Sequence, residues 1–244
     1  MKQPANKTHA SRTVIELRKK ILGGDLVGGT RLFEVPLAEE LEISRTPLRD
    51  AMSRLAEEGL LERARGGGFV VRQFSFADVI DSIELRGVLE GTAARLAAER
   101  GAVPEGLERM EAIVASLDDC FGEMPGEVDF EAYSDLNAQF HEGLAGLAGS
   151  EIVRREIERA ARLPFASPSA FLPDKGDIAA FRRSLNFAQE QHKAIIQAIR
   201  SREGFRAESV AREHARTARR NLEYILHEDR SLMQHVPGFA LVVA

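Results

Sequence analysis

The sequence predicts a mainly α-helical protein, in which a small domain of three helices and a hairpin precedes a larger all-helical bundle. Two observations carry this prediction. Strand patterns are confined to a short stretch between Leu60 and Arg72, whereas apolar residues elsewhere recur with helical period. The chain has 244 residues, which is enough for two modest domains. We expect these domains at residues 1–74 and 78–230, with a C-terminal tail at 231–244.

The N-terminal domain is predicted from five elements. Helices are expected over Ser11–Leu22, over Pro36–Leu41 and from about Thr46 to Glu58, each bounded by residues typical of helix ends. Leu60–Ala64 and Phe69–Arg72 have strand composition and are separated by a glycine-rich turn. Three helices followed by a small hairpin make a winged helix-turn-helix.

The second domain is predicted to contain six helices after a linker at Gln73–Ala77. Ser75 and Asp78 form the pattern of a capping pair at the start of the first helix, which runs to about Glu99. The other five helices are expected over Pro104–Asp118, Glu127–Leu147, Ser150–Leu163, Asp177–Arg200 and Phe205–Asp229.

Charge and composition limit the function classes. The net charge is −5, yet residues 1–75 contain 13 Lys and Arg against 10 Asp and Glu, and the remainder contains 20 against 28. A polyanion is therefore attracted to the first segment and repelled by the second. No apolar run approaches the ~20 residues that span a bilayer. The N-terminus is polar, and the single cysteine, Cys120, fits a reducing compartment. We expect a cytoplasmic protein without a membrane partner.

The run from Ile43 to Leu55 has the pattern of a DNA recognition helix. Pro47 is tolerated only near a helix start, so the helix begins near Arg45, where Ser44 or Thr46 can cap it. Unpaired N–H groups at such a start bind phosphates, and arginines on the outer face can reach guanine edges. The residues at i, i+3, i+4 and i+7 form the buried face: Leu48, Ala51, Met52 and Leu55.

The expected DNA contacts lie on this helix and on the hairpin. Arginine side chains are the candidates for base reading, small hydroxyl side chains for phosphate contact, and the glycine-rich turn for a wing along a groove. The alternative is a solvated amphipathic helix with surface arginines. The predicted contact residues are Arg45 and Arg49 for bases, Ser44 and Thr46 for phosphates, and Arg65, Gly66 and Gly67 in the wing.

This region resembles the GntR family of bacterial regulators over about Thr30 to Val71. The resemblance implies a DNA-binding transcription regulator, which we expect to be a repressor. A homodimer on a palindromic operator is expected, because one winged domain reads only a half-site. In that family, arginines at the positions of Arg45 and Arg49 contact bases, and a further arginine falls where this chain has Val35. The similarity is carried by Ser44-Arg45-Thr46-Pro47-Leu48-Arg49, Leu55, Glu58-Gly59-Leu60 and the glycine-rich turn.

The second half resembles the FCD effector domain of the FadR subfamily, and six helices favour the VanR-type branch. In many FCD domains one Asp and three His bind a divalent metal. By position the histidines are His141, His192 and His214, and the acidic ligand is replaced by Asn137. The matching segments are Ile83–Glu90 with Leu96–Ala98, Asp135–His141 with Leu144, Gln191–Ile195, and Arg212–His214.

The ligand set can also be weighed by its chemistry. Asn137 and His141 are separated by four residues and share a helix face, while His192 and His214 lie on other helices. Three imidazoles suit zinc or nickel. Asn137 offers a carbonyl oxygen without charge, so we expect it to be a weak or outer ligand. Asp135 points away from that face and cannot replace it.

A metal held in this way would leave a position for the carboxylate of a small organic acid, the expected effector. Arg86 could clamp that carboxylate; its alternative role is an intrahelical ion pair with Glu90. Two other functions compete with a ligand-responsive regulator. One is a metal-dependent enzyme whose three-histidine site activates water, and the other is a metal-free dimeric DNA-binding regulator. The enzyme hypothesis is weakened because the sequence contains no signature of a known hydrolase such as HExxH.

Overall fold

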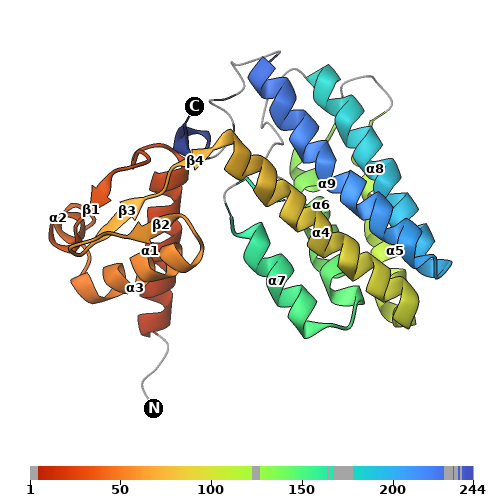
Figure 1. The fold of residues 1–244 in the computed structure, drawn as a ribbon, viewed down its shortest axis with the longest axis horizontal. Helices are drawn as coiled ribbons and strands as arrows, with labels where there is room; N and C mark the ends of the chain where they lie inside the picture. The colour runs from red at the N-terminus through yellow and green to blue at the C-terminus, as the bar shows by residue number, and fades with distance from the viewer. Residues whose placement is uncertain are drawn as a thin grey trace. The chain divides into compact units, whose positions relative to one another are not determined.

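The computed structural model describes residues 5–122, 127–163, 165–167, 178–227, 233, 236 and 238–243 (Figure 1). The chain divides into two compact units. The first comprises Met1–Val79, Arg162–Pro164 and Pro237–Ala244, and the second comprises Ile80–Ala161 and Phe165–Val236. The predicted fold class, a winged helix-turn-helix and an all-helical domain, is confirmed.

The first unit combines three helices with a small antiparallel sheet. The helices are α1 (Ala5–Leu22), α2 (Glu34–Glu40) and α3 (Arg45–Glu57). The predicted hairpin is present as β2 (Leu61–Arg63) and β3 (Phe69–Val71). A third strand, β1 (Arg31–Leu32), pairs with the other side of β3. It was not predicted, because two residues are too short to show an alternating pattern.

The core of this unit lies between α1 and α3, which pack along each other. Leu17 and Ile21 on α1 are fully buried, as are Leu48, Met52 and Leu55 on α3. The apolar stripe predicted for the recognition helix is therefore its packing face. The opposite face is left to solvent, which a helix that enters a DNA groove requires.

The predicted linker at Gln73–Ala77 is wrong, because this segment has regular structure. β4 (Phe74–Ser75) pairs in parallel with β5 (Val242–Val243), and α4 (Phe76–Arg100) follows at once. The short 3-10 helix η2 (Phe239–Leu241) precedes β5. Local patterns could not reveal this pairing, since the two strands are separated in sequence by the whole helical unit. The described residues 238–243, expected in a separate tail, belong to the first unit.

The predicted capping pair at the start of α4 is confirmed. The backbone N–H of Ser75 donates to Asp78 Oδ2 at 2.7 Å, and the N–H of Asp78 donates to Ser75 Oγ at 3.2 Å. These reciprocal bonds satisfy two donors at the helix start. The hydrogen bonds to Ser75 also lower the pKa of the Asp78 carboxyl.

The described part of the second unit contains the six expected helices: α4 (Phe76–Arg100), α5 (Pro104–Asp118), α6 (Phe130–Leu147), α7 (Glu151–Ala161), α8 (Ile178–Arg200) and α9 (Gly204–His227). α8 packs along α9, and α5 packs against α6 and α8 (Figure 1). α6 begins at Phe130 rather than Glu127, because Asp129 accepts a hydrogen bond from the N–H of Ala132 and caps it. No helix in the described ranges is long and apolar enough to cross a membrane.

Glycines on α4 bring it close to α9. A Cβ at Gly87 would lie 2.8 Å from the Cβ of Ala215, and one at Gly91 would lie 2.7 Å from Cγ of Arg212. Both distances are shorter than side chains tolerate. The close approach places Arg86 and Glu90, the neighbours of these glycines, beside the middle of α9.

Candidate functional site

The residues predicted to contact DNA lie on the surface of the first unit. Arg45, Thr46 and Arg49 on α3 are exposed, and the helix begins at Arg45 as predicted. Ser44 occupies the N-cap position with extended backbone angles, but its side chain makes no capping hydrogen bond. The expectation that Ser44 or Thr46 caps the helix through its side chain is therefore wrong for Ser44. The start of α3 keeps unpaired N–H groups beside two arginines.

The wing is a turn of three glycines, and hydrogen bonds from Arg31, which was not predicted to act here, hold it. Gly66, Gly67 and Gly68 all have positive φ, and a Cβ at Gly68 would lie 2.7 Å from the carbonyl oxygen of Leu32. Arg31 donates from Nη2 to the carbonyl oxygens of Arg65 and Gly67, at 3.3 and 2.8 Å. Arg65, Gly66 and Gly67 remain exposed. Arg31 escaped the sequence analysis because its role depends on the unpredicted strand β1.

Three histidines from three helices converge in the second unit. His141 on α6, His192 on α8 and His214 on α9 are all buried. Nε2 of His214 lies 3.1 Å from Nε2 of His192 and 3.3 Å from Nε2 of His141. Nitrogen ligands on one tetrahedral zinc ion, at about 2.0–2.1 Å from it, lie about 3.3–3.4 Å apart. The spacing therefore fits a single small cation.

The other ring nitrogen of each histidine faces a hydrogen-bond acceptor. Nδ1 of His141 donates to Glu90 Oε1 at 2.9 Å. Nδ1 of His192 donates to Gln189 Oε1 at 3.1 Å, and Nδ1 of His214 donates to Gln191 Oε1 at 3.3 Å. In each neutral ring the proton is therefore on Nδ1, and the lone pair is on Nε2.

The orientation of Gln189 is determined by its own partners. Its Nε2 donates to the carbonyl oxygen of Val114 at 2.8 Å and to Asp118 Oδ1 at 3.0 Å, and both of these atoms are acceptors. The amide oxygen must then face His192. This places the proton of His192 on Nδ1 and its lone pair on Nε2, and with the same tautomer in His141 and His214 three Nε2 lone pairs point at one another, an arrangement that a cation relieves.

Burial keeps the imidazoles of His192 and His214 in the neutral form that binds metal. Burial, followed by the neighbouring charges of His214 and His141, holds the pKa of His192 well below its usual value. Burial and His141 lower the pKa of His214 to about 3. Burial opposes ionisation of Glu90, but the positive charges of His141 and Arg86 outweigh it and hold the pKa of that carboxyl at about 2. At neutral pH, Glu90 is a buried anion, and the rings of His192 and His214 are neutral.

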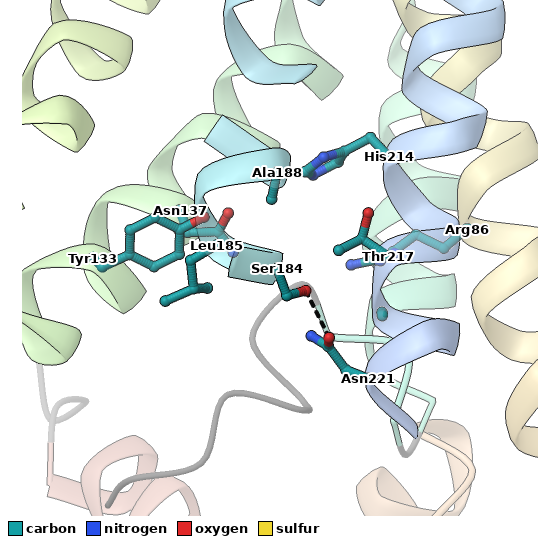
Figure 2. Close-up of a pocket in the computed structure, with 10 residues that line it drawn as sticks. Arg86, Tyr133, Asn137, Ser184, Leu185, Ala188, His214, Thr217 and Asn221 are labelled. Atoms are coloured by element: carbon teal, nitrogen blue, oxygen red, sulfur yellow. Dashed lines mark hydrogen bonds between the residues drawn. The ribbon is translucent and has the colours of Figure 1, made fainter. Parts of the chain in front are cut away.

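Asn137 shares the buried face of α6 with His141, as the spacing of four residues predicts. It is buried on α6, one turn before His141, whereas Asp135 is exposed on another face of the helix. Asn137 and His214 both line a pocket of about 30 Å³, enough for about two water molecules. Figure 2 shows Asn137 and Tyr133 on one side of this pocket and His214, Thr217 and Arg86 on the other. The remaining lining includes Ser184, whose Oγ donates to Asn221 Oδ1 at 2.6 Å.

Arg86 does not form the intrahelical ion pair with Glu90 that was its alternative role. It is 2% exposed, and its Nε and Nη1 have no hydrogen-bond partner among the described residues. Glu90 instead directs Oε1 at His141, and its Oε2 has no partner there either. A buried guanidinium with unsatisfied donors at a pocket wall is costly unless an anion binds it.

The acceptors of the histidine protons were missed by the sequence analysis. Glu90 and Gln191 lie in segments that resemble the FCD domain, but no pattern pairs either of them with a histidine, and Glu90 is 51 residues from the histidine it contacts. Gln189 is three residues before His192, a spacing that places both on one helix face and could have identified it. Among the other histidines, His227 is exposed, as expected, while the side chains of His9 and His235 lie outside the described residues.

Two family profiles match the two parts of the chain. Residues 9–71 match the bacterial regulatory proteins of the gntR family, and residues 81–217 match the FCD domain. The chain belongs to the GntR family and carries an FCD domain. This GntR protein is thus a DNA-binding transcription regulator with an effector domain rather than an enzyme.

Curated relatives of this GntR regulator are themselves regulators. It is 36% identical over 131 residues to the Nta operon transcriptional regulator of Aminobacter aminovorans, covering 53% of this chain and 59% of that protein, so the match spans less than two thirds of that relative. It is 27% identical to the transcriptional regulator LutR of Bacillus subtilis, covering 80% and 92%. It is also 27% identical to the galactonate operon transcriptional repressor of Escherichia coli, covering 90% and 98%.

Solved structures agree on the fold. The chain of E. coli McbR/YncC superposes with a TM-score of 0.61 at 20% identity, covering 90% of this chain and 98% of that one. A Listeria monocytogenes protein described as Lar, which controls the agr system, superposes with a TM-score of 0.59 at 20% identity, covering 90% and 99%.

Proposed function

We propose that this GntR regulator binds a palindromic operator as a homodimer, and that a small organic acid changes its operator affinity from a metal site in the FCD domain. The observation that carries the effector site is the convergence of three Nε2 lone pairs next to a buried, unsatisfied arginine. Zinc or nickel suits three imidazole ligands, with Asn137 as a weak or outer ligand. The six helices support the VanR-type branch of the subfamily.

DNA binding rests on the exposed face of α3 and on the wing. Arg45 and Arg49 are proposed to read bases, and the N–H groups at the start of α3, with Ser44 and Thr46, to hold phosphates. Arg65, Gly66 and Gly67 in the wing are proposed to lie along the adjacent groove. Each protomer then reads one half-site.

The effector is proposed to bind through a carboxylate. Nε and Nη1 of Arg86 are both buried without a partner among the described residues, and a guanidinium is the side chain best suited to bind a carboxylate. A bound divalent ion would supply an open coordination position for the same carboxylate. Asn137, Ser184 and Thr217 offer further hydrogen-bonding groups along the pocket wall. The name of the E. coli relative, which regulates a galactonate operon, supports an organic acid.

Repression relieved by the effector is the proposed direction of regulation. Two relatives are named repressors, those of galactonate and D-xylose operons, and one is named an activator. The effector must bind unequally to two arrangements of the dimer, because a ligand of equal affinity for both shifts nothing. The arrangement that it favours is proposed to hold the two recognition helices at a separation that fits the operator poorly.

The decisive experiment measures operator affinity by gel retardation, with and without zinc, after a thermal-shift screen of small carboxylates that includes galactonate. We expect one acid to weaken operator binding of the zinc-loaded protein. Arg86→Met should lose that response yet keep its operator affinity and its stability, because methionine fills the site without unsatisfied donors. An unchanged response in Arg86→Met would remove Arg86 from the effector site. If the acid changed operator affinity without any metal, the result would contradict the metal site and favour a metal-free regulator.

The oligomeric state gives a separate test. We expect a homodimer at micromolar concentration, held mainly by the FCD domain, because two-fold symmetry of the protein matches a palindromic operator. Light scattering coupled to size-exclusion chromatography measures the mass directly, against 26.9 kDa for one chain. A monomeric mass both with and without operator DNA would contradict the dimer.

A further inference from the structure

Glu90 is a buried carboxylate beside the histidine cluster, where Asn137 replaces the aspartate ligand of many FCD domains. It is 1% exposed, and within the described part of the helical unit it is the only buried Asp or Glu. The three histidines and Asn137 are neutral ligands, so a divalent ion among them would meet no negative charge from its direct ligands. Burying such a charge without compensation is costly.

The contacts of Glu90 direct its charge at the histidine cluster. Oε1 accepts the Nδ1 proton of His141 at 2.9 Å, and Nε2 of the same ring faces His214 at 3.3 Å. A carboxylate that accepts this proton makes the imidazole a better electron donor at its other nitrogen. Arg86, one turn earlier on α4, forms no hydrogen bond with Glu90, so the charge of the carboxylate is not neutralised by a direct ion pair.

The acceptors of the other two histidine protons differ from Glu90 because they are uncharged. Gln189 and Gln191 orient His192 and His214 through neutral amide oxygens, which fix the ring tautomer but add no charge. Gln191 is further held by Thr217, whose Oγ1 donates to the same Oε1 at 3.3 Å. All three acceptors position a ring, and only the one on α4 also supplies an anion.

We propose that Glu90, acting through His141, supplies the negative charge that sets the metal affinity of this site in place of the missing aspartate. This inference rests on the proposed metal site. Glu90 is a positioning residue, since it does not touch the ion, and its effect is exerted through the hydrogen bond to His141. The site thus contains one compensating anion, which is hydrogen-bonded to a metal ligand instead of being a ligand itself.

The test is the zinc Kd of the full-length protein, measured by competition with a chromogenic chelator. Glu90→Gln keeps the length and an acceptor oxygen for His141 but removes the charge. We expect it to weaken zinc binding by about 10- to 100-fold, the range typical of outer-layer partners. Glu84→Gln removes the same charge from the same helix, at a residue paired with Arg216 on the surface, and should leave the Kd unchanged.

Rescue separates a charge effect from a merely structural one. Asn137→Asp should tighten zinc binding in the wild-type background, and the double variant Glu90→Gln/Asn137→Asp should return to near the wild-type Kd. An unaltered Kd in Glu90→Gln, or no rescue by the aspartate, would overturn the role of Glu90 while leaving the metal site intact. Failure of the wild type to bind zinc would overturn both.

A measurement on the zinc-bound wild type keeps the inference testable if Glu90→Gln does not fold. Nitrogen and proton NMR of the imidazole rings should place a strongly hydrogen-bonded proton on Nδ1 of His141 and the zinc on Nε2. Zinc found on Nδ1 of that ring would displace Glu90 from its contact and overturn the role.

Discussion

Zinc added to the metal-free protein is expected to raise the free energy of unfolding by about 4 kcal/mol when the free ion exceeds its Kd a thousandfold. The reason is the geometry of the histidine cluster. Nε2 of His214 lies 3.1 Å from Nε2 of His192 and 3.3 Å from Nε2 of His141, all three rings are buried, and an ion binds this arrangement only in the folded state. Urea denaturation with zinc and with a chelator measures the difference.

The matched variants are His192→Ala and His227→Ala. His192 is a member of the cluster, so its loss should abolish most of the zinc-dependent increment, whatever it does to the stability of the metal-free protein. His227 is exposed at the end of α9, and its replacement should leave the increment intact. Equal increments in the two variants would place the zinc elsewhere on the protein.

Arg49→Ala is expected to weaken specific operator binding by about 1–3 kcal/mol, or roughly 5- to 150-fold. Arg49 is exposed on the outer face of α3, one turn after the helix start, while Leu48 and Met52 bury the inner face. The substitution should therefore leave the fold intact. Affinities for the operator and for unrelated DNA, each over a range of salt concentrations, measure the effect.

Arg49→Lys distinguishes base reading from phosphate binding. Lysine keeps the charge but lacks the planar fork that pairs with a guanine edge. If Arg49 reads a base, the lysine variant should lose specificity and keep nearly the same salt dependence. Operator affinity equal to that of the wild type in both variants would exclude Arg49 from the contacts with DNA.

Much of this architecture could be predicted because its signals are local. The apolar stripe on α3 has strict helical spacing, and Pro47 restricts where that helix begins. The capping pair of Ser75 and Asp78 lies within one turn. The positions of His141, His192 and His214 were carried over from a family resemblance, and their convergence follows from a bundle in which α6, α8 and α9 meet.

The remaining features depend on contacts between distant parts of the chain. No local pattern indicates that Glu90 on α4 accepts a proton from His141 on α6, or that Arg86 is left without that carboxylate. Gly87 and Gly91 decide how closely α4 approaches α9, but a glycine in a helix looks like a weak point until its neighbour is known. Strands of two residues, such as β1, are too short to have a period.

The pairing of β4 with β5 has a consequence for how the protein is made. β4 leaves the ribosome before any of the helical unit, and its partner, Val242–Val243, leaves after it. At about 5–20 residues per second, β4 must wait on the order of 10 s for its partner. During that interval Phe76 lacks the ring of Phe239, which lies 6.3 Å from it in the finished fold. The DNA-binding unit thus completes its folding only once the helical unit has been synthesised.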